Sequence, residues 1–173
     1  MQLADLLAAF AIVGLVLAAT LTVFAQGQRA YTQGAGRVES QQAARVALAR
    51  MSREIRQAGR CGAAVSPIAV AERSRIAIQH DLDGDGTAAA RGEKVTWLWS
   101  AGVLRRDAGG GAQPIVNGVR TLELTYRDAL GRPTETPSTV RSVIITLTTV
   151  PERPGSGGPT STTLTTEVRL RNR

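Results

Sequence analysis

The stretch that decides the fold is LLAAFAIVGLVLAATLTVFA, residues 6 to 25, which carries no charge. Twenty residues of helix rise about 30 Å, the thickness of the hydrocarbon core of a bilayer. A cleaved signal peptide is the alternative, but its apolar core is shorter and follows Lys or Arg, whereas the charged residue before this stretch is Asp5. The stretch therefore predicts a helix that enters a membrane.

The helical pattern continues beyond the span and changes character. Gly27, Gly34 and Gly36 follow, and each glycine costs about 1 kcal/mol of helix propensity relative to alanine. We therefore expect a flexible or locally melted joint over residues 27 to 36. Further on, one narrow stripe recurs at spacings of three and four residues, and Gly59 after it predicts the end of the helix. The stripe consists of Val38, Gln41, Ala44, Leu48, Met51, Ile55 and Ala58.

The stripe predicts a helix that packs along one side, with Leu48, Met51 and Ile55 as its main packing residues. The simplest partner is the chain's own domain, and a sharper interpretation is a helix shared between that domain and other subunits. The two interpretations are compatible. The charged side chains are predicted mostly off the stripe: Arg45, Arg50, Arg53, Glu54 and Arg56.

Residues 60 to 173 alternate apolar and polar side chains, which is typical of strands. Leu122, Leu124 and Tyr126, for example, share one face of a strand whose other face carries Val119, Thr121, Glu123 and Thr125. Strands are predicted at 76–80, 94–99, 103–107, 119–128, 141–150 and 162–170, with a tight hairpin turn at residues 100 to 102. Linkers rich in Gly and Pro predict loops at 109–114, 129–138 and 151–159.

Together these patterns predict an α+β fold. A long N-terminal helix, apolar in its first half and amphipathic in its second, packs on one face of an antiparallel meander of about five strands. The predicted parts are an apolar membrane helix at 1–28, an amphipathic helix at 29–59 and a globular β domain at 60–173.

The composition excludes several function classes. The 173 residues include one His and one Cys, so neither a His/Cys metal site nor an intrachain disulfide can form. No nucleophile and base surround His80 in the sequence, and we interpret it as a surface residue at a strand end and the chain as no enzyme. Cys61 is predicted to be buried. The aromatic content of 3% argues against a surface that stacks bases or sugars.

The net charge of +7 comes almost entirely from arginine. Such an excess suits DNA or another anionic surface, but a charge spread over strands and loops is more often simply solvated, and nothing else supports a nucleic-acid partner. The first basic residues, Arg29, Arg37 and Arg45, all follow the apolar span. By the positive-inside rule they would hold the rest of the chain in the cytoplasm, unless a basic leader once preceded Met1.

One motif has the residue types of a calcium loop. In DLDGDG, residues 81 to 86, Asp81, Asp83 and Asp85 alternate and Gly86 lies where such a loop turns sharply. The twelfth position, however, is Gly92, and the acid follows one place late at Glu93. The alternative is a plain acidic connector with Asp-Gly turns. Apart from calcium at these three carboxylates, the sequence predicts no cofactor.

The N-terminus, MQLADLLAAFAIVGLVLAAT, resembles the processed N-terminus of a type IV pilin or a type II secretion pseudopilin. QQAARVALARMSREIRQAGR at 41–60, VRTLELTYRDALGRP and RSVIITLTT are similar to minor pilins of the PilW type. The resemblance covers the whole chain and is strongest over the first 60 residues. Two departures stand out: the acid is Asp5 where the family has Glu, and the basic leader that ends in Gly is absent.

The resemblance implies a filament subunit that is inserted in the bacterial inner membrane and then polymerises through its N-terminal helix into an extracellular or periplasmic filament. It implies that Met1 is a mature N-terminus, cleaved by a prepilin peptidase and N-methylated, and that the partners are pilin subunits and the inner-membrane assembly machinery. A carboxylate beside an apolar span needs an opposite charge, and Asp5 would meet the amino group of Met1 or that of a neighbouring subunit. Alternatively, Asp5 only complements the helix dipole. The alternative function is a single-span, membrane-anchored β domain that binds a ligand and does not polymerise.

Overall fold

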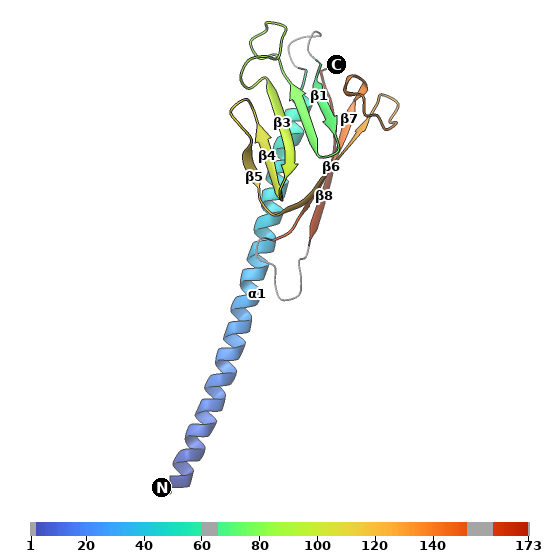
Figure 1. Cartoon of the computed structure of the whole chain (residues 1–173). Coiled ribbons are helices and arrows are strands. Elements are labelled where there is room, and N and C mark those ends of the chain that lie inside the picture. Colours follow the sequence, from blue (N-terminus) through green and yellow to red (C-terminus); the bar gives the residue numbers. More distant parts are fainter. Residues whose placement is uncertain (1–2, 60–65, 152–160, 173) are drawn as a thin grey trace.

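A computed structural model describes residues 3–59, 66–151 and 161–172 and has the predicted α+β fold. One helix, α1 (Leu3–Gln57), projects from a β-rich head in which its last turns are embedded (Figure 1). Its 55 residues rise about 83 Å, so most of the length of the molecule is helix.

The helix runs without interruption through Gly27, Gly34 and Gly36, so the predicted melted joint over residues 27 to 36 is wrong. A Cβ atom added at Gly27 or Gly34 would meet nothing within 4 Å, so neither glycine serves a close contact. A propensity cost of about 1 kcal/mol at each site is too small to open a helix that good helix formers extend on both sides. At the other end Gly59 stops the helix as predicted, with a φ of 75° and its N–H donated to the carbonyl of Gln79.

The strands form two antiparallel sheets, where the sequence predicted one meander. Five strands pair in chain order as sheet A: β1 (Ile68–Glu72), β2 (Arg75–Gln79), β3 (Lys94–Ser100), β4 (Val103–Asp107) and β5 (Gln113–Val116). Three strands form sheet B in chain order: β6 (Val119–Arg127), β7 (Ser142–Thr149) and β8 (Thr162–Arg169). All six predicted strands are present, and β1 and β5 are additional.

The hairpin of β3 and β4 turns at Ala101 and Gly102, both with positive φ, as predicted. β5 begins inside the segment 109–114, which was predicted to be a loop throughout, so that prediction is wrong at Gln113 and Pro114. The chain passes to sheet B directly after β5, at Asn117 and Gly118.

Two turns of sheet A dock on the open edge of β6 and join the sheets. Leu124 donates its N–H to the carbonyl of Arg73 at 2.8 Å, and Val119 donates to Gly102 at 2.9 Å. The Tyr126 hydroxyl donates to the carbonyl of Glu72 at 2.7 Å, and burial raises the pKa of that phenol. The edge of β6 is therefore occupied by the rest of the head.

One apolar core joins the two sheets and the last turns of α1. Trp97, Ile78 and Ile145 are fully buried in it. Val119 also belongs to this core, although it was predicted on the outer face with Thr121. A register shift between these two residues moves Val119 to the inner side of the sheet.

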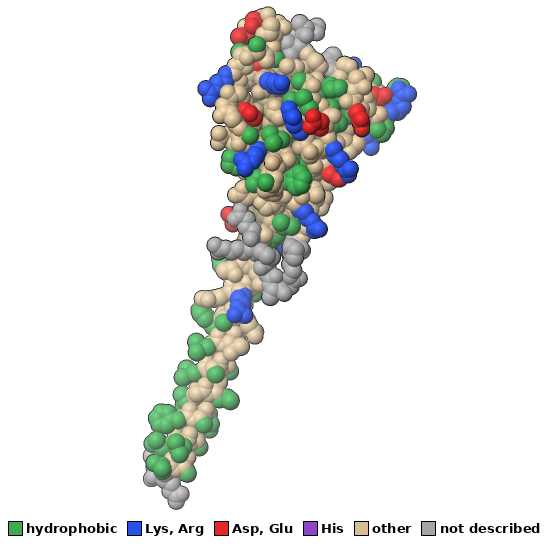
Figure 2. Space-filling view, viewed as in Figure 1, with side chains coloured by type: hydrophobic (Ala, Val, Ile, Leu, Met, Phe, Trp, Pro, Cys, Tyr) green, Lys and Arg blue, Asp and Glu red, His purple; other side chains and the backbone are tan. Residues whose placement is uncertain are grey.

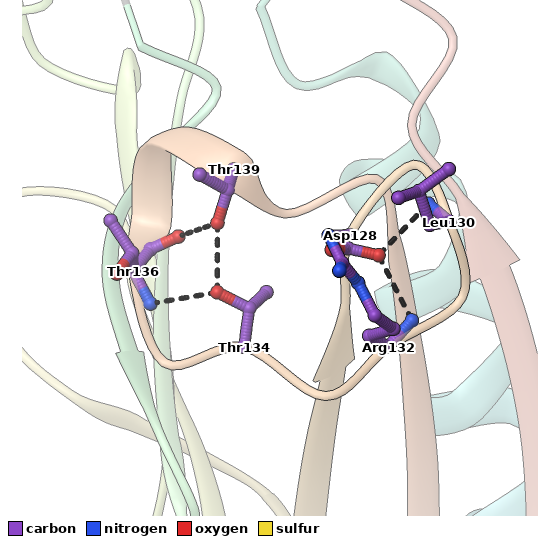
Figure 3. Close-up of polar contacts among 6 residues, drawn as sticks. All are labelled: Asp128, Leu130, Arg132, Thr134, Thr136 and Thr139. Atoms are coloured by element: carbon purple, nitrogen blue, oxygen red, sulfur yellow. Dashed lines mark hydrogen bonds and ion pairs between the residues drawn. The ribbon is translucent and has the colours of Figure 1, made fainter.

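The loop from β6 to β7 is closed by its own side chains (Figure 3). The Asp128 carboxylate accepts the N–H groups of Leu130 at 2.8 Å and Arg132 at 2.9 Å, and the Arg132 N–H holds the pKa of Asp128 below its ordinary value. Further along, Thr134 and Thr139 share a hydroxyl contact beside the short 3-10 helix η1 (Pro137–Thr139). The predicted loop at 129–138 is thus an ordered one.

Candidate functional site

The N-terminal half of α1 is an exposed apolar rod. Every residue from Leu3 to Thr32 is exposed, and Figure 2 shows hydrophobic side chains along this part of the helix while charges of both signs spread over the head. Within the described residues, one helix is long and apolar enough to cross a membrane, and it is this one. So large an exposed apolar surface is unfavourable in water, and the length and composition of the helix are compatible with a membrane anchor.

The two threonine hydroxyls of the apolar span are satisfied within the helix itself. The Thr20 hydroxyl donates to the carbonyl of Val16 at 2.7 Å, and the Thr22 hydroxyl donates to Ala18 at 2.7 Å. Because these two donors need no water, the apolar span can lie in hydrocarbon or against other helices without leaving either hydroxyl unpaired.

Asp5 lies in the first turn of α1, at the end of the apolar rod that is farthest from the head. An acid in this turn also complements the positive end of the helix dipole. Its predicted partner Met1 lies outside the described residues, so the pairing of the two stays a prediction.

Every predicted stripe residue except Val38 is at least partly buried, and Ala47 and Ser52, which were not predicted on the stripe, are buried as well. Leu48, Met51 and Ile55 are buried against the chain's own sheets, which supports the interpretation of a helix docked on its own domain. Val38 was placed on the stripe but is 62% exposed, because it lies below the head. The stripe therefore begins to pack only near Gln41, which donates to the hydroxyl of Thr162 at 3.2 Å.

Glu54 was predicted off the stripe, but its side chain also contacts the head. Its carboxylate accepts from the Trp97 indole N–H at 2.8 Å and from Arg106 Nε at 3.0 and 3.1 Å, and it also pairs with Arg50 at 3.2 Å. This network fixes α1 on sheet A. A single acid beside an apolar stripe carries no sequence signal of such partners, which come from strands far along the chain.

The acidic loop brings its three predicted aspartates together. Asp81, Asp83 and Asp85 each offer a carboxylate oxygen, and these oxygens lie within 4.8 Å of one another. Asp81 is buried and its two oxygens accept the N–H groups of Gly84 and Gly86 at 2.7 and 3.1 Å. These are the side chains that could hold a calcium ion, since calcium takes clustered carboxylate oxygens.

Glu93 is turned to the backbone of the same loop. One of its oxygens accepts the N–H of Leu82 at 2.9 Å and the other that of Ala90 at 2.8 Å. The Leu82 N–H lowers the pKa of Glu93, and the Thr87 N–H lowers that of Asp85. Glu93 therefore joins the two ends of the loop through its hydrogen bonds and does not belong to the cluster of three aspartates.

His80 is buried, so its predicted position on the surface is wrong. Its ring Nδ1 lies 3.2 Å from the carbonyl oxygen of Gln57, and its backbone N–H donates to the carbonyl of Glu93. The end of β2 is joined to the end of α1 by this contact and by the Gly59 N–H, which donates to the carbonyl of Gln79. Cys61, predicted to be buried, lies outside the described residues.

No family model matches the chain, and no curated protein matches it either.

Proposed function

We propose that the chain is a structural subunit of a filament of the type IV pilus or secretion pseudopilus kind, inserted in the inner membrane and polymerised through α1. One observation carries the proposal: α1 is a single helix of 55 residues whose exposed apolar half continues, without a hinge, into a half packed in the head. An anchor needs only about 20 apolar residues and tolerates a loose linker. A subunit whose helix must bundle with those of its neighbours while carrying a head needs this rigid geometry.

The alternative is a single-span membrane protein whose β domain binds a ligand and which stays a monomer. The same apolar span would anchor it, so the presence of the span does not distinguish the two functions. The features that favour the filament are the acid at Asp5, the uninterrupted helix and the resemblance of the N-terminal segment to pilins.

The proposal implies that copies of this chain or other pilin subunits are its partners, together with the inner-membrane assembly machinery and a prepilin peptidase. A mature N-terminus at Met1, N-methylated, belongs to the same proposal. We also propose that Asp81, Asp83 and Asp85 bind calcium, on the closeness of their oxygens.

The experiment is the substitution Asp5→Ala in the cells that produce the protein, with Asp5→Glu as the matched control. Asp5→Ala removes a charge from the edge of the span, so membrane insertion is retained or improved. Incorporation into filaments sheared from the cells should fall, because a neighbouring amino group loses its partner, while Asp5→Glu should retain it. The amounts are measured by immunoblotting the membrane and sheared fractions.

Full incorporation of Asp5→Ala would show that Asp5 only complements the helix dipole. A wild-type chain that stays in the membrane fraction and never enters sheared filaments would favour the anchored ligand-binding domain.

A further inference from the structure

Among the described strands the two sheets have four edge strands, and three of them are poorly suited to pairing with another chain. β1 is short and carries a register shift, β5 is shorter still and contains Pro114, and the edge of β6 takes the turns of sheet A. β8 differs from all three. It has eight residues in unbroken register with β7, without a proline or lysine, and among the described strands β7 is its one neighbour.

The register shows which groups of β8 face outward. In β6, the Leu124 N–H donates to Arg73 and the Tyr126 carbonyl accepts from Thr134, so the backbone groups of these even-numbered residues point away from β7. Because successive residues of a strand bond to opposite sides, the odd-numbered residues of β6 bond to the even-numbered residues of β7. The odd-numbered residues of β7 then bond to the even-numbered residues of β8, and Leu170, which donates to Arg141, follows the same rule. The N–H and C=O groups on the outer edge of β8 therefore belong to Thr163, Thr165, Glu167 and Arg169.

No backbone hydrogen bond leaves this outer edge within the part of the chain that the structure describes. The edge thus presents alternating donors and acceptors with the spacing of a strand, which an added strand satisfies.

A second copy of the chain does not fit this edge. Thr162 meets α1 at Gln41, and Asn172 meets it at Gln57, so β8 and α1 run in the same direction. An antiparallel pair of β8 strands would therefore point one apolar helix away from the membrane that holds the other. In a parallel pair related by a two-fold axis along the strands, identical N–H groups face each other at one height, whereas a parallel ladder needs an offset.

The helix flank beside the edge is basic. Gln41 faces β8, and Arg45 lies one turn further along the same flank of α1. Arg56 is eleven residues beyond Arg45, which is about three turns, and so returns to nearly the same side. Both arginines are exposed, and neither forms an ion pair among the described residues. A strand added to β8 would run beside these two positive charges, which favours acidic side chains on it.

We propose that the outer edge of β8 binds an extended, acidic peptide segment of another protein by strand addition. The backbone of the segment pairs with Thr163, Thr165, Glu167 and Arg169, and its acidic side chains meet Arg45 and Arg56. The inference does not depend on filament formation, because a monomeric membrane-anchored chain presents the same edge.

The test uses the full chain in detergent micelles and a capped synthetic peptide that alternates valine and threonine and carries two glutamates. A second peptide has lysines in place of the glutamates. The readout is amide hydrogen exchange resolved by residue. Without peptide, the amides of Thr163, Thr165, Glu167 and Arg169 should exchange rapidly while those of the even-numbered residues are protected by β7. The acidic peptide should protect the odd-numbered amides and should bind about tenfold more tightly than the basic one.

Three variants separate the edge from the flank. Thr165→Pro removes one outward N–H without breaking the ladder to β7, and should abolish peptide binding. Because this variant could disturb the strand, Arg45→Glu provides a second measure. It should lower the affinity for the acidic peptide by about tenfold and raise the affinity for the basic peptide. Arg53→Glu is the matched control, since Arg53 is exposed on a different side of α1, and it should leave the affinity for both peptides unchanged.

The proposal is overturned if the odd-numbered amides are already protected without peptide, or if neither peptide protects them. It is equally overturned if Arg53→Glu lowers the affinity for the acidic peptide as much as Arg45→Glu does.

Discussion

The two halves of α1 form one continuous helix but have opposite environments. From Leu3 to Thr32 every residue is exposed, whereas Ala44, Met51 and Ile55 further along are completely buried. The first half is apolar all round and therefore suits lipid or a bundle of helices, and the second is apolar on one stripe and suits a sheet. The difference teaches that the second half contributes to the stability of the head, whereas the exposed first half packs against nothing in the described part of the chain.

The largest expected effect comes from removing a side chain in the packed half. Met51→Ala leaves a cavity between α1 and the sheets and should lower the free energy of unfolding of the head by about 2 to 5 kcal/mol. Leu17→Ala is the matched control in the exposed half, where Leu17 is 57% exposed, and should leave that free energy unchanged. Denaturant unfolding of the full chain in detergent, followed by the fluorescence of Trp97 and Trp99, measures both.

An equal loss of unfolding free energy in Met51→Ala and Leu17→Ala would contradict this division of α1 into a packed and an exposed half. It would mean that the exposed half also contributes to the stability of the head.

The sequence was sufficient for the features that depend on neighbouring residues. Periodicity predicted the helix, the Leu48, Met51 and Ile55 stripe and all six long or regular strands, because each pattern reports which side of a local element is buried. The Asp81 to Asp85 spacing likewise predicted three carboxylates that the loop brings together.

What the sequence did not predict depends on residues far apart in the chain. The division into two sheets is decided where turns of sheet A meet the edge of β6, for example through Arg73 and Leu124. The burial of His80 and the network around Glu54 likewise arise from contacts between α1 and strands that follow it by many residues. β5 has only four residues, and the first four residues of β1, Ile68 to Ala71, are all apolar, so neither strand shows alternation. The low helix propensity of glycine was outweighed by helix on both sides.

The glycines of α1 and its end provide the next comparison. Gly59→Ala places a Cβ 2.6 Å from Pro67 Cγ and 2.7 Å from the Asn172 carbonyl oxygen, at a φ of +75°. This strain should lower the free energy of unfolding by about 1 to 3 kcal/mol. Gly34→Ala meets no atom within 4 Å and should instead stabilise the helix by about 1 kcal/mol.

The two substitutions are measured by thermal unfolding of the head and by helix content from circular dichroism in detergent. If Gly34→Ala lowered the helix content, the glycines would serve a bend that the continuous helix does not contain.

The smallest expected effect tests the acidic loop, which lies where the packed half of α1 ends, next to His80 and Gln57. If the three aspartates bind calcium, an ion at about ten times its dissociation constant adds about 1.4 kcal/mol, and the melting temperature of the head should rise by a few degrees. Asp83→Ala should remove this rise, because Asp83 is one of three carboxylates whose oxygens lie within 4.8 Å. Asp107→Ala removes an aspartate that also accepts two backbone N–H groups, those of Gly109 and Gly111, but lies outside the cluster, and should retain the rise.

Calcium should leave the helix content of the exposed half unchanged, since the metal acts only on the folded head. Identical melting curves in calcium and in chelator would show that the N–H groups of the loop are sufficient partners for its carboxylates, with Glu93 as the brace that holds the loop closed.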